Sequence, residues 1–246
     1  MIDEWGKGAK YWDRAWNPMI GCRKASEGCR KASEGCANCY AAHMAERFPE
    51  LRDASGGFEP HPPKHLKRPP SKGVVFVGNM TDIFGDWNDA CTLFDWFHSL
   101  STDAENLVLT KRAHRLPPHS SMKHIHVGIT AENQARYDER IARFVCFRQA
   151  GIPWLSVEPL LGPIDMGLCH FAPDELPFGW VVVGAESGPN RRPCKLAWVR
   201  LIVGQCRDYG IPIFVKQLNI HGKLVKDIEK FPADLQIRQV PWRAAI

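Results

Sequence analysis

The sequence predicts an α/β fold in which six or seven βα units form a partial TIM-type barrel. Two observations predict it: short, continuous apolar runs recur along the chain, and segments with helical periodicity lie between several of them. Continuous apolar runs are typical of parallel strands, which are covered on both faces. The length of 246 residues suits one such domain but is too short for eight full units beside the long loops. A doubly wound open sheet is the competing architecture.

The expected strands are rich in β-branched residues, and the expected helices have apolar residues three or four positions apart. The strands cover Trp16–Cys22, Val74–Gly78, Leu107–Leu109, Ile125–Ile129, Pro153–Val157, Trp180–Val183 and Ile211–Val215. Helices are expected over 41–48, 93–100, 137–145 and 196–206. Between 109 and 125 the helical pattern is weak, because Pro117 and Pro118 lie near its middle.

The composition indicates one cytoplasmic domain over 1–246, with a cysteine loop over 22–39 and a Pro- and Lys-rich linker over 61–72. No apolar run reaches the roughly 18 residues of a membrane span, and the N-terminus lacks the apolar region of a signal peptide. Four of the nine cysteines crowd into one segment, which favours metal binding over a disulfide framework. The net charge of +5 permits a nucleic-acid partner without requiring one.

The cysteine segment contains a tandem duplication. From Gly21 it reads GCRKASEGCRKASEGCANCY, and the units Arg23–Cys29 and Arg30–Cys36 are identical. Removal of either copy leaves Cys-x6-Cys-x2-Cys-Tyr, which indicates a working set of three thiolates. A four-iron cluster held by three cysteines keeps one iron open for another ligand.

We predict Cys29, Cys36 and Cys39 as the cluster ligands, with Cys22 as the alternative to Cys29. In radical S-adenosylmethionine (SAM) chemistry the open iron binds SAM, and reduction by one electron yields a 5′-deoxyadenosyl radical. The competing interpretation is a zinc site made of four cysteines, or of three with His43, because Cys-x2-Cys is common to both kinds of site.

Polar residues follow each predicted strand, and the active site of a parallel α/β fold lies at that carboxyl edge. They are Asn79, Thr81 and Asp82; Thr110, Lys111 and Arg112; Thr130, Glu132 and Asn133; Ser156 and Glu158; Glu186 and Ser187; and Lys216 and Gln217. Helix caps explain the individual hydroxyl residues equally well. The recurrent Glu and Lys residues are better explained by a polar ligand.

Several blocks of sequence resemble a phage- and prophage-associated family of radical-SAM-like proteins, related to spore photoproduct lyase and similar enzymes. The blocks are WNPMIGC (Trp16–Cys22), GCANCYA (Gly35–Ala41), GNMTDIF (Gly78–Phe84), LTKR (Leu109–Arg112), VGITAEN (Val127–Asn133), SVEPLLGPI (Ser156–Ile164), VVVGAESGP (Val181–Pro189) and FVKQ (Phe214–Gln217). Together they span nearly the whole chain. The duplicated unit departs from the spacing in that family.

The resemblance implies a partial barrel of the radical SAM kind that binds a [4Fe-4S] cluster and SAM. It implies an enzyme that modifies a base in phage DNA, such as a hypermodified thymine, in the host cytoplasm and with an external one-electron donor. The implied cofactor-binding residues are Thr81, Asp82, Thr130, Glu132, Asn133 and Ser156. The implied catalytic residues are Lys111, Glu158, Glu186 and Lys216. For Asp82 and Glu158, an ion pair with a nearby lysine is the alternative.

Two other functions remain open. One is a zinc-binding, nucleic-acid-binding protein without radical chemistry. The other is a folded protein whose duplicated loop has disabled the site.

Overall fold

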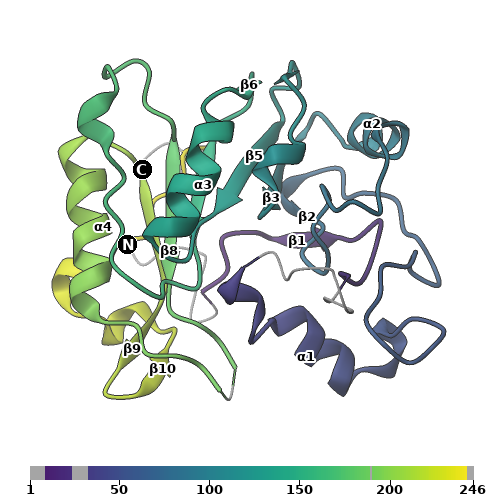
Figure 1. Cartoon of the computed structure of the whole chain (residues 1–246), viewed down its shortest axis with the longest axis horizontal. Helices are drawn as coiled ribbons and strands as arrows, with labels where there is room; N and C mark the ends of the chain where they lie inside the picture. Colours follow the sequence, from purple (N-terminus) through teal and green to yellow (C-terminus); the bar gives the residue numbers. More distant parts are fainter. Residues whose placement is uncertain (1–8, 24–32, 189, 243–246) are drawn as a thin grey trace.

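The computed structural model describes residues 9–23, 33–188 and 190–242, and a curled eight-stranded sheet forms its centre (Figure 1). The strands follow chain order across the sheet: β1 (Arg14–Trp16), β2 (Gly73–Val77), β3 (Ala104–Thr110), β5 (Ile125–Thr130), β7 (Trp154–Val157), β8 (Trp180–Gly184), β9 (Ile213–Ile220) and β10 (Lys223–Val225). The first seven are parallel, and β10 is antiparallel to β9. A separate small sheet pairs β4 (His119–Ser120) with β6 (Arg148–Gln149).

The described residues form four α-helices: α1 (Tyr40–Arg47), α2 (Ala90–Ser99), α3 (Gln134–Phe144) and α4 (Leu196–Asp208). Short 3-10 turns cover Glu34–Cys36, Pro49–Leu51, Ala113–Arg115, Leu168–His170, Ile228–Lys230 and Ala233–Leu235. Asp89 and Asn133 begin α2 and α3, and each side chain accepts a hydrogen bond from a first-turn backbone N–H. No helix in this part of the chain is both long and apolar enough to cross a membrane.

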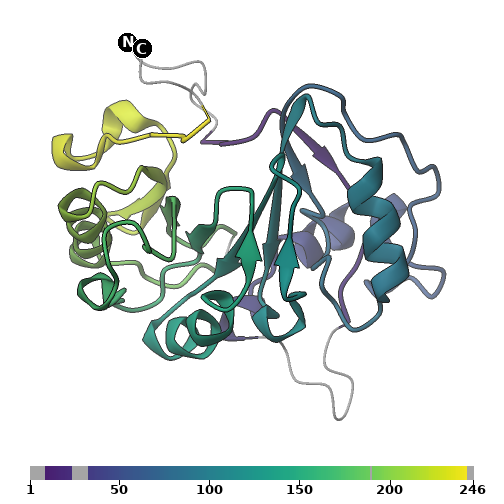
Figure 2. The same ribbon diagram turned by 90° about the horizontal axis from the view of Figure 1, so that it is seen from above.

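The sheet is buried on both faces, which explains why its strands read as continuous apolar runs. Helices α2, α3 and α4 lie around the outside of the curl (Figure 2), where residues such as Val199 and Phe144 pack against one face of the strands. An aromatic cluster of Tyr11, Phe76, Trp154, Trp180 and Phe214 fills the inner face. Its rings pack edge to face or tilted, the arrangement that aromatic quadrupoles favour.

The predicted helices and six of the predicted strands are present, but the predicted partial barrel of six or seven βα units is wrong. The strands of the described sheet outnumber the helices. Strands β1 and β10 form its two edges and do not pair with each other, so the described sheet does not close into a barrel. No α-helix connects β3 to β5 or β7 to β8. Both connections contain prolines, Pro117 and Pro118 in the first and Pro159, Pro163, Pro173 and Pro177 in the second. Proline lacks the N–H that continues a helix, so these crossovers remain irregular.

The first predicted strand, Trp16–Cys22, is also shorter than expected, because β1 ends at Trp16. Beyond it the chain pairs with the Pro- and Lys-rich segment instead: Ile20 and His61 exchange two backbone hydrogen bonds of 2.9 Å. The indole N–H of Trp16 donates to the carbonyl of Lys67 at 2.8 Å. The 61–72 segment therefore packs on the N-terminal strand.

Two glycines, one packed against the sheet and one on an open helix surface, provide a matched test of the packing around β5. A Cβ at Gly151 would overlap the carbonyl oxygen of Ile125 at the start of β5, whereas a Cβ at Gly204 in α4 would meet no atom within 4 Å. We expect Gly151→Ala to lower the free energy of unfolding by about 2 kcal/mol, as overpacking does. We expect Gly204→Ala to raise it by about 0.5–1 kcal/mol through helix propensity. Urea denaturation measures both, and a wild-type midpoint for Gly151→Ala would contradict the described packing.

Candidate functional site

A cavity of about 270 Å³ lies at the carboxyl edge of the parallel strands. It is lined by polar side chains at or just beyond the strand ends, by Lys216 and Gln217 of β9, and by Tyr11, Trp12 and the cysteine segment. The strand-edge residues are Asn79, Thr81, Asp82, Thr110, Lys111, Arg112, Thr130, Ser156, Glu158, Glu186, Ser187, Lys216 and Gln217. The structure thus brings most of the sequence-predicted polar residues into one site.

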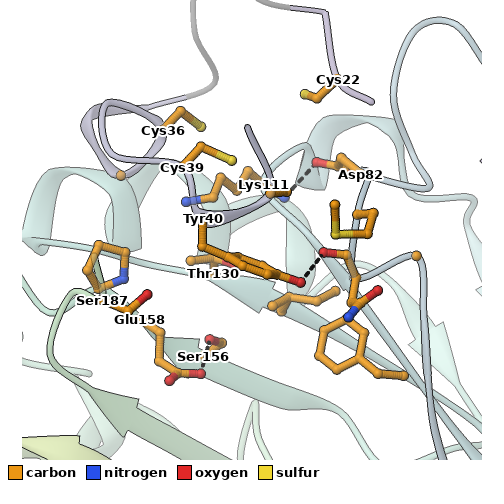
Figure 3. A pocket seen from close by; sticks show the side chains of 18 of the residues that line it. Cys22, Cys36, Cys39, Tyr40, Asp82, Lys111, Thr130, Ser156, Glu158 and Ser187 are labelled. Atoms are coloured by element: carbon orange, nitrogen blue, oxygen red, sulfur yellow. Dashed lines mark hydrogen bonds between the residues drawn. The ribbon is translucent and has the colours of Figure 1, made fainter. Parts of the chain in front are cut away.

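The thiols of Cys22, Cys36 and Cys39 line this same cavity. Figure 3 shows them at one end of it, with Ser156 and Glu158 at the opposite end. The predicted ligand Cys29 lies outside the described residues. Among the residues that are described, no three His, Cys, Asp or Glu side chains gather closely enough to form a ready-made metal site. The three described cysteines thus line one end of the cavity but are not drawn together around a common point.

Cys22 is held by its backbone. Its N–H donates to the carbonyl of Phe58 at 3.0 Å, and the N–H of Gly21 donates to Met80 at 3.1 Å. Gly21 has a φ of +93°, and a Cβ there would overlap the carbonyl oxygen of Glu59, so only glycine fits this position. Burial raises the pKa of the Cys22 thiol to about 12, although the nearby Arg112 guanidinium opposes the rise. The metal-free thiol is therefore protonated at neutral pH.

Cys36 and Cys39 lie where the chain enters α1. Cys36 ends the 3-10 turn that begins at Glu34, and Cys39 is the residue directly before the helix. The first N–H groups of a helix have no partner within the helix and carry partial positive charge. This position favours an anionic group, such as a thiolate or a cluster held by thiolates.

Lys111, which lines the cavity, pairs with Glu132, which is buried just outside the lining. The Lys111 ammonium and the Arg140 guanidinium, at 2.9 Å, both pair with the Glu132 carboxylate, whose side chain is 0% exposed. Burial raises the pKa of Glu132, but the two positive charges outweigh it, so the net pKa is lowered. The Lys111 ammonium is thus already engaged by a carboxylate.

Asp82 is the centre of a second group. Its carboxylate accepts hydrogen bonds from Thr110 Oγ1 at 2.7 Å, from Lys111 N at 3.0 Å and from Arg112 Nη1 at 3.0 Å. The Arg112 guanidinium also lies 4.8 Å from the centre of the Trp87 ring, a cation–π distance. The alternative prediction for Asp82, an ion pair, fits these contacts, although the partner is an arginine. Asp82 holds the turn after β3.

Glu158 and Lys216 form an ion pair of 3.0 Å at the end of the cavity away from the cysteines. The hydroxyls of Tyr11 and Ser156 each donate to Glu158 Oε2 at 3.3 Å. The Lys216 ammonium lies 5.3 Å from the Tyr11 ring and 5.4 Å from the Trp12 ring. An acid, a base and aromatic faces therefore meet here.

Glu186 is buried and pairs with Arg192. It accepts from the backbone N–H of Arg192 at 2.8 Å and from its Nε at 3.0 Å. Burial tends to raise the pKa of Glu186, but the hydrogen bonds from Arg192 and Asn38 outweigh burial, so the net pKa is lowered. The predicted catalytic residues Lys111, Glu158, Glu186 and Lys216 are thus all engaged in ion pairs.

The predicted cofactor-binding residues divide into two sets. Thr81, Asp82, Thr130 and Ser156 line the cavity, and Thr81 Oγ1 is buried without a hydrogen-bond partner among the described residues. Glu132 and Asn133 are not in the lining. Asn133 begins α3 and accepts from Arg136 N at 3.0 Å, the helix-cap role that fits its position directly before a helix.

The sequence analysis missed the residues that hold the charged groups in place. Arg140 comes from α3, Tyr11 from the N-terminal segment, and Ser33 and Asn38 from the cysteine segment itself. One signal was available for Asn38, which lies between Cys36 and Cys39. No local pattern marks Arg140, because helix periodicity alone does not separate a buried arginine from an exposed one.

The fold and the site together define an α/β protein with a thiol-lined cavity at the carboxyl edge of a curled, mostly parallel sheet. The chain belongs to the family described as "Protein of unknown function (DUF5131)", whose profile matches residues 7–234. Neither the curated proteins nor the solved structures include a significant match to the chain.

The Asp82 group yields a stability prediction. We expect Asp82→Asn to lower the free energy of unfolding by about 2 kcal/mol, since a charged acceptor of several hydrogen bonds becomes neutral while Arg112 stays mostly buried. Asp86→Asn is the matched control, because Asp86 meets Arg23 at 3.6 Å with both side chains nearly half exposed. Its effect stays within about 0.5 kcal/mol. Equal effects in chemical denaturation would contradict the role of Asp82.

The raised pKa of Cys22 yields a reactivity prediction. A rise from 9.0 to about 12 lowers the thiolate fraction at pH 8 about a thousandfold, and the greater basicity of the thiolate recovers part of this. We expect iodoacetamide to modify Cys22 in the metal-free protein about thirtyfold more slowly than the exposed Cys91. Mass spectrometry of the two peptides measures the rates. Comparable rates would show that Cys22 is not buried as described.

Proposed function

We propose that the protein is a radical SAM enzyme, in which three cysteine thiolates hold a [4Fe-4S] cluster and the cavity binds SAM. The observation that supports this proposal is the placement of three thiols at one end of a cavity whose walls are strand ends with polar side chains. The cluster and SAM, when bound and reduced by an external one-electron donor, would supply a 5′-deoxyadenosyl radical.

The donor set fits such a cluster. Thiolates are the ordinary ligands of iron–sulfur clusters, and Cys36 and Cys39 come from one short turn beside the first turn of α1. The third ligand is Cys29 or Cys22. Cys22 lies in the cavity wall and is held by backbone hydrogen bonds, which supports it as the alternative. Binding of iron to Cys22 requires loss of the thiol proton, and Arg112 nearby favours the resulting negative charge.

The other cavity residues offer contacts for a polar cofactor and a planar substrate. The Thr81 hydroxyl has no hydrogen-bond partner in the described part of the chain and can bond to a ligand, since a buried polar atom without a partner is costly. Tyr11, Trp12 and Phe76 present aromatic side chains next to the Glu158–Lys216 pair. A nucleobase offers a planar face and an edge with donors and acceptors, which suits aromatic and charged neighbours.

A base in phage DNA, such as a hypermodified thymine, is therefore the substrate that we propose, with the host-cell cytoplasm as the place of reaction. The net charge of +5 is compatible with a polyanion. An enzyme that acts on a base in duplex DNA must first extrude it, and the cavity lies at the end of the sheet where an extruded base could enter.

Metal analysis after anaerobic purification tests the cluster. We expect about four irons and four sulfides per chain, an electron paramagnetic resonance signal that changes on addition of SAM, and formation of 5′-deoxyadenosine under reduction. Cys36→Ser and Cys39→Ser are expected to lose the iron, and the exposed Cys146→Ser is the matched control that keeps it. A comparison of Cys22→Ser with Cys29→Ser identifies the third ligand.

One zinc per chain and no iron would overturn the proposal. Salt-dependent DNA binding by that zinc protein would then favour the zinc-binding, nucleic-acid-binding alternative.

A further inference from the structure

We propose that Glu132 and Glu186 are positioning residues that hold the cysteine segment, Ser33–Tyr40, against the carboxyl edge of the sheet. The family resemblance implied a cofactor-binding role for Glu132 and a catalytic role for Glu186. Their contacts assign both carboxylates to the segment that carries two of the thiols. We call these contacts of Glu132 and Glu186 with the segment the clamp. The importance of the clamp for catalysis rests on the proposed function, but the existence of the clamp does not.

The first contact is made by Glu132, which follows β5. The hydroxyl of Ser33 donates to Glu132 Oε1 at 2.5 Å, and both side chains are buried. Gly35 packs so closely on the same carboxylate that a Cβ there would overlap it. Lys111 pairs with the same oxygen as Ser33, and Arg140 pairs with Glu132 Oε2. The segment therefore docks on a carboxylate that cannot turn away without breaking its ion pairs with Lys111 and Arg140.

The second contact is made by Glu186, which follows β8. The side-chain amide of Asn38 donates to Glu186 Oε2 at 3.0 Å and to the carbonyl of Asn190 at 2.8 Å. Arg192 holds the same carboxylate through its backbone N–H and its guanidinium. Both oxygens of Glu186 thus already accept hydrogen bonds, an arrangement that suits a structural anchor better than a general base.

The two contacts lie on either side of Cys36. The N–H of Cys36 donates to the carbonyl of Ser33 at 3.0 Å, so the position of Ser33 sets that of Cys36. Asn38 directly precedes Cys39. Beyond Cys39, the hydroxyl of Tyr40 donates to the carbonyl of Asn79 after β2 at 2.7 Å (Figure 3). Three strand ends thus hold the short segment that presents both thiols to the cavity.

The duplication in the sequence supports this assignment. Ser26, Glu27 and Gly28 repeat Ser33, Glu34 and Gly35, but only the second copy is followed by Ala37, Asn38 and Cys39. Only the second copy therefore has both the serine that donates to Glu132 and the following asparagine that donates to Glu186.

Alkylation of the metal-free protein tests the clamp directly. Ser33→Ala removes the hydroxyl that donates to Glu132, and Asn38→Asp places a carboxylate against Glu186, while neither change replaces a residue of the ion pairs at the sheet. Each variant is expected to raise the alkylation rates of Cys36 and Cys39 by about twofold to tenfold, the range for loss of one hydrogen bond in a local opening. The exposed Cys91 and Cys146 are internal references for the reagent, and the buried Cys194 and Cys206 report whether the chain stays folded.

Glu34→Gln is the matched control. Glu34 lies in the same segment and pairs with Arg136 at 2.9 Å, but its side chain is 51% exposed. Arg136 donates to both oxygens of Glu34, but solvent screens this pair, so the alkylation rates are expected to change by less than about twofold. Glu132→Gln and Glu186→Gln are the sheet-side variants, and the buried Cys194 and Cys206 show whether the remaining chain stays folded.

Unchanged rates at Cys36 and Cys39 in both Ser33→Ala and Asn38→Asp would overturn the clamp. Rates that also rise at the buried Cys194 and Cys206 would overturn it too, because they would indicate general unfolding. Iron content supplies the separate readout: if the wild type binds no iron but the variants still expose Cys36 and Cys39, the proposed function fails while the clamp stands. If wild-type iron binding is retained and both variants lose iron with the control unaffected, both proposals are supported.

Discussion

The buried carboxylate of Glu132 is the interaction on which the site depends. It joins Lys111 after β3, Arg140 of α3 and Ser33 of the cysteine segment. An isolated anion with 0% exposure would be very costly, and the two cations and the hydroxyl compensate for its burial. Removal of one partner leaves an uncompensated charge, so the three elements hold one another in place.

The cavity has two chemically different ends. Three thiols lie at one end, where the chain enters α1, and the Glu158–Lys216 pair with its aromatic neighbours lies at the other. Between them, Asp82 and Arg112 hold the turn after β3. A site with soft ligands at one end and a mixed polar and aromatic surface at the other can bind an inorganic cofactor and an organic molecule together. This arrangement is what makes the proposed radical chemistry physically reasonable.

Much of the secondary structure could be predicted from local pattern. Runs such as Val74–Gly78 and Trp180–Val183 became strands because both faces of the sheet are covered, one by helices and one by the Tyr11 and Trp154 cluster. The barrel prediction failed because a count of βα units assumes a helix in every crossover. Prolines such as Pro118 and Pro163 leave two crossovers without one, and the antiparallel β10 ends the sheet.

The sequence by itself determined that thiols crowd near one strand end and that polar residues follow the others, because these are properties of spacing along the chain. Only the tertiary structure decided which of those polar residues face the cavity. Thr81 and Ser156 do, Asn133 caps a helix, and Glu132 turns toward Arg140 and the cysteine segment. The reason is that a buried carboxylate is stable only where cations and hydrogen-bond donors compensate its charge. Those partners are distant in the sequence: Ser33 and Glu132 are 99 residues apart, and Asn38 and Glu186 are 148 apart.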